Sequence, residues 1–199
     1  ADIVVGPVQP LGIHMNCGGG VSGFIATSDN ERYVREYNTL NISITETDIE
    51  GQFGFGLSLA GQTSYGLREA GKDWTGNSAY LWAIAGAVYM ALLGPSGFRE
   101  VGELIIQQSN YASINISKID GIKTCFDSSF FKEFLLNFDD CRLTVSEINK
   151  ELRKRNIFGG KDLSVEYPEL GQCALYCVTE VHTKQDIENL VNNLNEIIS

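Results

Sequence analysis

The spacing of hydrophobic residues predicts that the first part of the chain is rich in strands. Residues 2–5 are short, apolar and β-branched, which predicts a buried parallel strand, and residues 21–27 predict the next strand. Apolar and polar residues alternate over residues 41–47 and again over 53–59. With a turn between them, these two runs predict a β-hairpin.

The second half has the pattern of helices that pack on a small sheet. Residues 79–93 are apolar on nearly all sides, which predicts a buried helix. Gly94 and Pro95 should end this helix and begin another that runs to about Ile116. After it we expect strands over residues 123–126, 132–138 and 173–179, and helices over residues 145–155 and 184–198.

Two threonines mark the starts of the last two helices. Thr144 with Glu147, and Thr183 with Asp186, have the spacing of capping boxes. Two helices on one face of a small, largely antiparallel sheet are the natural arrangement for this order of elements. The expected core consists of Phe134, Leu136, Leu175, Cys177, Ile187 and Leu190.

Composition and charge narrow the class of protein. The chain has 199 residues, is 43% hydrophobic and carries a net charge of −10. No cluster of Lys and Arg is dense enough to follow a phosphate backbone, which argues against nucleic acid as a partner.

The longest apolar stretch, residues 79–93, is too short to span a bilayer, so no membrane association is expected. The sequence begins inside a predicted strand, as expected for a piece of a longer protein.

The cysteines indicate free thiols. Five are present, an odd number, and their spacing matches neither a zinc site nor a disulfide framework, so no metal is expected. Cys173 and Cys177 lie four residues apart in a predicted strand, so their side chains should share one face. Buried free thiols suit a reducing compartment, and we expect a cytoplasmic protein.

Several stretches, in order and over nearly the whole chain, match the patterns of one known family. The opening ADIVVGPVQPLGIHMNCGGGVSGFIAT is similar to a family strand, a loop with a QPLGIP-like core and a paired glycine, and a second strand. AVYMALLGPSGFREVGEL, residues 87–104, resembles the pattern AVYLALLGPEGLREVAEL. FFKEFLLNF, residues 130–138, and the segment from IFGGKDL to QDIENLV, residues 157–191, match further family patterns. Each motif is weak alone, but together they make the chain resemble the P-protein of the glycine cleavage system, closest to its subunit 1.

The resemblance implies an α/β fold, PLP-dependent transferase fold type I. Residues 1–100 would be the end of the large domain and its sheet, and residues 101–199 the small C-terminal domain with a largely antiparallel sheet. The family reaction implied is the decarboxylation of glycine on pyridoxal phosphate (PLP), followed by transfer of the aminomethyl group to the lipoyl arm of the H-protein.

The lysine that would hold PLP as a Schiff base is missing here. By resemblance, Gln9 stands where that lysine falls in the cofactor-bearing subunit 2. An amide nitrogen is not a usable nucleophile, so this chain should bind no cofactor covalently and have no catalytic residue of its own at this position. Subunit 1 of the family lacks this lysine as well. PLP would then belong to a lysine-bearing partner, subunit 2.

Four polar residues are candidates for lining a shared site or interface: His14, Asn16, Arg68 and Lys72. His14 follows the first strand, at the edge where open α/β sheets bind ligands. Arg68 and Lys72 would bind a carboxylate or phosphate of a neighbouring subunit. A loop histidine without function, and solvated loop cations, are the simpler interpretations.

Two stretches depart from the family pattern and leave alternatives open. SYGLREAGKDWTGNS, residues 64–78, keeps Arg68 and Glu69 of a RREKATSN-like stretch but has Ala70 in place of its lysine. Residues 37–47 replace a PGRIVGET-like stretch. A non-catalytic paralogue with a scaffolding or regulatory role is therefore the alternative to an active subunit. A third hypothesis, another fold-type I enzyme with its lysine elsewhere, is disfavoured by Gln9.

The first 80 residues are expected to pack against another copy of the chain or a partner protein. They contain only the last strands of a larger sheet, whose unpaired backbone groups and apolar side chains form an edge that favours pairing. We expect a homo-oligomer when the chain is alone.

Overall fold

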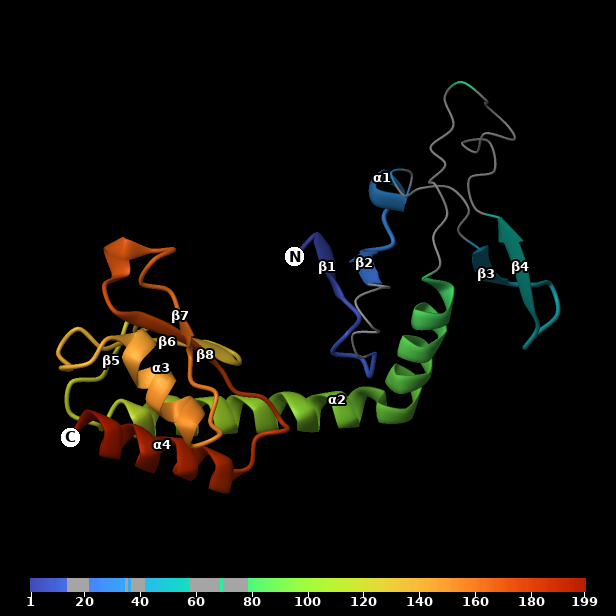
Figure 1. Ribbon diagram of the computed structural model, residues 1–199. Coiled ribbons are helices and arrows are strands. Elements are labelled where there is room, and N and C mark those ends of the chain that lie inside the picture. The colour runs from blue at the N-terminus through green and yellow to red at the C-terminus, as the bar shows by residue number, and fades with distance from the viewer. Residues whose placement is uncertain (14–21, 35, 37–41, 58–68, 70–78) are drawn as a thin grey trace. The chain divides into compact units, whose positions relative to one another are not determined.

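The computed structural model describes residues 1–13, 22–34, 36, 42–57, 69 and 79–199 (Figure 1). Two compact units make up the chain, residues 1–93 and residues 94–199. The elements, in chain order, are β1 (Ile3–Pro7), β2 (Gly23–Thr27), α1 (Glu31–Val34), β3 (Ile42–Glu46), β4 (Phe53–Leu57), α2 (Tyr80–Ile116), β5 (Lys123–Thr124), β6 (Glu133–Asn137), α3 (Val145–Lys154), β7 (Lys161–Asp162), a 3-10 turn (Pro168–Leu170), β8 (Cys173–Cys177) and α4 (Lys184–Ile198).

The helical segment α2 is two helices separated by a break at Gly94. Gly94 has φ 59° and ψ −178°, a backbone conformation that a helix does not contain and that favours glycine. Pro95 follows at the start of the second helix, as expected from the sequence. The division between the compact units falls at this break rather than near residue 100. The assignment of the units to a large and a small domain stays a prediction.

One segment of the described residues, Leu81–Ile116, is long and apolar enough to cross a membrane by length and composition alone. The apolar run expected from the sequence ends at residue 93. The break at Gly94 divides the segment, and the part before it is shorter than the roughly 17 residues that a spanning helix needs. The part after the break carries Arg99, Glu100 and Glu103. Length and composition are therefore weak evidence for a span here.

The first sheet is antiparallel and exposed, which corrects the expected buried parallel strand. β1 pairs with β2 with Ile3 opposite Thr27 and Pro7 opposite Gly23. No helical crossover, which a parallel pair requires, lies in the described part of the connection between these strands. Successive residues point to opposite faces, and Val4 and Val5 are 50% and 67% exposed. Both faces of this small sheet are thus apolar and uncovered by the described residues.

The first half of α2 is also exposed, although its apolar character predicted burial. Leu81, Ile84, Val88 and Leu92 all lie on the surface, and Leu92 is 82% exposed. Among the described residues of this unit, the turn that follows β1 packs on one side of the helix. The sequence pattern correctly identified a helix that requires cover on all sides, but the described chain does not provide that cover.

The predicted hairpin is confirmed. β3 and β4 are antiparallel, with Ile44 opposite Phe55 and Thr45 opposite Gly54. Thr47 closes the turn, because its N–H donates to the carbonyl of Gln52 at 3.1 Å.

The second unit is a four-stranded antiparallel sheet with helices on one face (Figure 1). The strand order is β5-β6-β8-β7. Phe134 and Leu136 of β6 and Ile116 of α2 lie in one buried cluster with Leu152 of α3 and Leu194 of α4. The two-layer arrangement expected from the order of elements is confirmed for residues 94–199.

The core face of β8 differs from the expected one. Ala174 and Tyr176 are buried in the core, whereas Leu175 is half-buried and Cys177 is exposed. β8 is apolar at both odd and even positions, so its sequence pattern alone selects neither face. Packing decides, because the Tyr176 ring lies over Gly160, where a Cβ would come within 2.5 Å of the ring. The same ring stacks on Phe134 with a centroid separation of 5.8 Å.

Both capping boxes are present. The Thr144 side chain accepts from the N–H of Glu147, whose carboxylate accepts from the N–H of Thr144 at 2.9 Å. Thr183 and Asp186 form the same pair, with the return bond at 2.8 Å. Each box satisfies two backbone donors that a helix start leaves unpaired, and so fixes the first residues of α3 and α4.

A carboxylate connects the end of β6 to the segment before β8. Asp139 accepts from the N–H of Gln172 at 2.8 Å and from the Asn137 amide at 2.7 Å. These hydrogen bonds, the first above all, hold the pKa of Asp139 below its usual value. Gly171 must be glycine, because its φ is 70° and a Cβ would lie 2.3 Å from the Asp139 carboxylate.

The core assignment predicts different effects of two leucine truncations on opposite faces of the sheet. Leu136→Ala should lower the free energy of unfolding of this unit by about 2–5 kcal/mol, because the side chain is fully buried. Leu175→Ala, the matched control, should lower it by roughly 1–2 kcal/mol, since Leu175 is only half-buried. Urea unfolding followed by circular dichroism measures both, and equal losses would contradict the assignment.

The Asp139 interactions predict a dependence of stability on acid. Because its folded pKa lies below the unfolded one, Asp139 stabilises the fold at neutral pH, and this contribution is lost as pH falls through the folded pKa. Asp139→Asn should be less stable at pH 7 and should lose less stability between pH 5 and 2 than the parent chain. An equal loss of unfolding free energy between pH 5 and 2 in the two proteins would contradict this.

Candidate functional site

The turn after β1 carries Gln9, the residue expected at the cofactor position. Val8 and Ile13 anchor this turn, each 7% exposed. The Val8 N–H donates to the Ser22 carbonyl at 3.0 Å, and the Ile13 N–H donates to the Gln9 carbonyl at 3.2 Å. The turn is therefore closed on itself and tied to the start of β2.

The turn packs on the first half of α2 through its glycine. Gly12 has φ 78°, and a Cβ there would lie 2.7 Å from the Tyr89 ring. Ile13 reaches Gly86, where a Cβ would be 3.7 Å from the Ile13 Cδ1. Any side chain at residue 12 would be strained and would push the turn away from Tyr89.

The side-chain oxygen of Gln9 lacks a hydrogen-bond partner among the described residues. This atom, Oε1, is buried. Trp82 on α2 has an indole Nε1 in the same condition. A buried amide oxygen without a donor costs free energy, roughly 1–3 kcal/mol, so polar cover is expected from elsewhere. Sequence reasoning missed Trp82, because a tryptophan in an apolar helix gives no signal of an unpaired donor.

These residues do not fit a covalently held PLP. A Schiff base needs an amine, and residue 9 supplies a carboxamide. Lys72 is the one lysine in the sequence of residues 1–93, and it lies outside the described residues. His14, Asn16 and Arg68 lie outside them too. Of the five residues singled out from the sequence, the structure thus places only Gln9.

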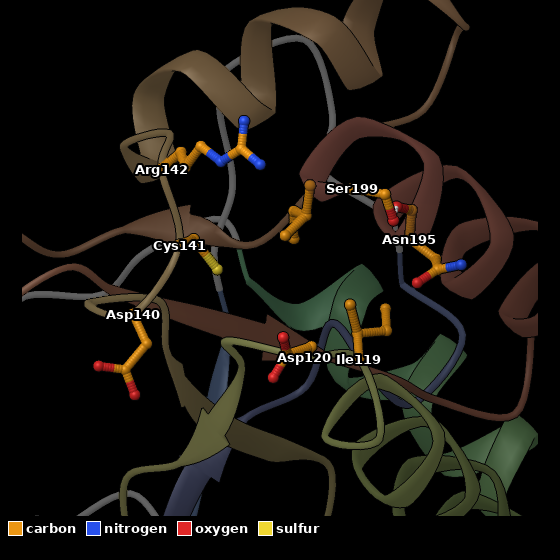
Figure 2. Close-up of a pocket in the computed structure, with 8 residues that line it drawn as sticks. Ile119, Asp120, Asp140, Cys141, Arg142, Asn195 and Ser199 are labelled. Atoms are coloured by element: carbon orange, nitrogen blue, oxygen red, sulfur yellow. Dashed lines mark hydrogen bonds between the residues drawn. The ribbon is translucent and has the colours of Figure 1, made fainter.

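The second unit has a cavity of about 210 Å³, which Figure 2 shows surrounded by three segments of the chain. Asp120 follows α2, Cys141 lies between β6 and α3, and Asn195 comes from α4. The Cys141 thiol donates to the Gly121 carbonyl at 3.3 Å, and burial raises its pKa. A thiol with a raised pKa is a poor nucleophile. Among the described residues, no group of three His, Cys, Asp or Glu side chains is placed to hold a metal ion.

A family model described as the glycine cleavage system P-protein matches residues 1–194. The chain belongs to the glycine cleavage system P-protein family. It is 39% identical over its full length to the probable glycine dehydrogenase (decarboxylating) subunit 1 of Staphylothermus marinus, and spans 42% of that protein. It is 36% identical to the subunit 1 protein of Desulfitobacterium hafniense over 99% of its length, and spans 43% of that protein. The chain thus spans less than half the length of these relatives.

Solved structures agree with this P-protein assignment. A crystal structure of glycine decarboxylase (P-protein) in inhibitor-bound form matches with a TM-score of 0.79 and 32% identity, over 99% of this chain and 43% of that one. A sphingosine-1-phosphate lyase of Burkholderia pseudomallei matches at TM-score 0.62 and 14% identity, over 98% of this chain and 37% of the lyase, which shows a shared fold alone. The fold is that of PLP-dependent fold type I proteins, as expected from the sequence.

The absence of an amine at residue 9 predicts how this P-protein chain behaves toward PLP. Incubation with PLP followed by borohydride reduction should leave no covalent adduct on the peptide that contains Gln9, which peptide mapping by mass spectrometry measures. Gln9→Lys is the matched variant, because it restores an amine at that position and should acquire the adduct. A reduced adduct on the Gln9 peptide of the parent chain, or a Gln9→Lys variant without one, would contradict the prediction.

Proposed function

We propose that this chain is part of subunit 1 of a PLP-dependent glycine decarboxylase, working with a lysine-bearing subunit 2. The observation that carries the proposal is a match to subunit 1 relatives along the whole of this chain, and Gln9, which by resemblance stands where the cofactor lysine would fall, supports it. In this proposal subunit 2 holds PLP, which supplies the electron sink for decarboxylation of glycine. The aminomethyl group then passes to the lipoyl H-protein, in the cytoplasm.

The surface of residues 1–93 supports a role within a larger assembly. β1 and β2 expose apolar side chains on both faces, and the first half of α2 exposes Leu81, Ile84 and Leu92. Apolar surface of this extent on adjacent elements marks interfaces rather than solvent-facing surface. The relatives' name, subunit 1, implies a partner subunit. We infer that this surface is covered in the complete protein, and that the chain alone forms homo-oligomers through it.

In this proposal the chain supports the active site, and the partner subunit carries out the chemistry. The Gln9 turn is fixed by Val8, Ile13 and Gly12, so it is a rigid surface next to α2. Two buried polar atoms of this unit, Gln9 Oε1 in the turn and Trp82 Nε1 on α2, have no hydrogen-bond partner among the described residues. No described residue favours the scaffolding alternative over this one.

Reconstitution with subunit 2 tests the proposal. The protein that carries this chain, purified with the lysine-bearing subunit 2, should release CO2 from glycine in the presence of lipoyl H-protein. Either subunit alone should be inactive, and a control complex whose subunit 2 has its lysine replaced by alanine should be inactive as well. Equal activity of subunit 2 with and without this protein would overturn the proposal.

A further inference from the structure

Two thiols from distant parts of the chain meet at the sheet of the second unit. The Sγ atoms of Cys125 and Cys173 are 3.0 Å apart, although the residues are separated by 48 positions in sequence. A disulfide bond is about 2.05 Å long, so a movement of roughly 1 Å would bring the two sulfur atoms to bonding distance. The cysteine spacing gave no sign of this pair, because only the strand order β5-β6-β8 places the two residues together.

One thiol of the pair is fixed and the other can shift. Cys173 is the first residue of β8 and is 1% exposed. Cys125 follows the two-residue edge strand β5 and is half-buried. Its N–H donates to the Leu135 carbonyl at 3.1 Å, and the chain bends at this residue. Cys125 is therefore the residue that would move, and the one that a small reagent would reach first.

The hydrogen bonds assign the protons of the two thiols. The Cys173 thiol donates to the Leu170 carbonyl at 2.8 Å. The thiol of Cys125 is then the donor toward the Cys173 sulfur. Burial, this contact with Cys173 and the charge of Asp139 together raise the pKa of Cys125 to about 12. Cys125 is thus a protonated thiol at neutral pH.

We propose that Cys125 and Cys173 form an oxidative modification site, at which hydrogen peroxide joins them in an intramolecular disulfide. The Cys125 sulfur attacks one peroxide oxygen and the O–O bond breaks, which gives a sulfenic acid and one water. The Cys173 sulfur then attacks the sulfenic sulfur, the S–O bond breaks, and the hydroxyl leaves with the Cys173 proton as a second water. The pair is oxidised by two electrons and the peroxide is reduced to water.

The disulfide would connect the end of β5 to the start of β8 across β6. It would constrain the unfolded chain between residues 125 and 173 and so stabilise the second unit. It would also remove the thiol donor from the Leu170 carbonyl. Since peroxide attack requires thiolate, the raised pKa makes the reaction slow at neutral pH and faster at high pH.

Peptide mapping after peroxide treatment tests the site. The 199-residue chain, treated at pH 7 to 10 and digested without reduction, should yield one linked peptide pair that contains Cys125 and Cys173 and has lost two hydrogen atoms. Its rate of formation should rise roughly tenfold for each pH unit, since the thiolate fraction does so below the pKa. The melting temperature of the second unit should rise on the order of 10 °C and return on reduction with a dithiol.

Matched cysteine variants separate this pair from the other thiols. Cys177→Ser and Cys141→Ser should keep the linked peptide, because Cys177 is exposed and Cys141 donates to Gly121 instead. Cys173→Ser should lose it and leave Cys125 as a sulfenic acid that a cyclic 1,3-diketone captures. The peptide map of the oxidised parent chain tests the proposal even if the Cys173→Ser variant does not fold. A parent chain whose oxidation gives only Cys177 products, or Cys125 oxidised without a link, would overturn the proposal.

Discussion

The need to cover both faces of an apolar element from water governs both units of this chain. In residues 94–199 the need is met on one face, where α3, α4 and the second half of α2 enclose a core around Leu136 and Leu194. The opposite face is less apolar and stays partly exposed, as an antiparallel sheet permits. In residues 1–93 the strands β1 and β2 are apolar on both faces and are covered on neither by the described residues. The described residues of the first unit therefore leave the apolar side chains of these strands exposed.

The family to which the chain belongs bears on this difference in exposed apolar surface between the two units. The chain matches its subunit 1 relatives along its whole length but spans only 42% of the Staphylothermus marinus protein. The turn around Gln9 is tightly packed, with Gly12 against Tyr89, and residue 9 is an amide that cannot form a Schiff base. The missing amine is consistent with the proposal that a partner subunit supplies the chemistry.

The second unit is stabilised by polar interactions at its edges as well as by its core. Two capping boxes fix the starts of α3 and α4, and Asp139 fastens the end of β6 to the segment before β8. The Cys125 and Cys173 thiols lie in the same region, and the charge of Asp139 contributes to the raised pKa of Cys125. The loops at this end of the sheet are thus joined by several short-range contacts rather than by burial alone.

The sequence by itself determined the features that depend on local chemistry. Capping spacing located the starts of α3 and α4, Gly94 with Pro95 located the break in α2, and the ordered motifs identified the family and the amide at residue 9. Tertiary structure decided what depends on neighbours. β8 is apolar at both odd and even positions, so only packing of Tyr176 over Gly160 selected its buried face. Likewise, the exposure of the first half of α2 and the meeting of Cys125 with Cys173 depend on elements far away in sequence. Periodicity describes only one segment at a time, whereas exposure and side-chain proximity are properties of pairs of segments.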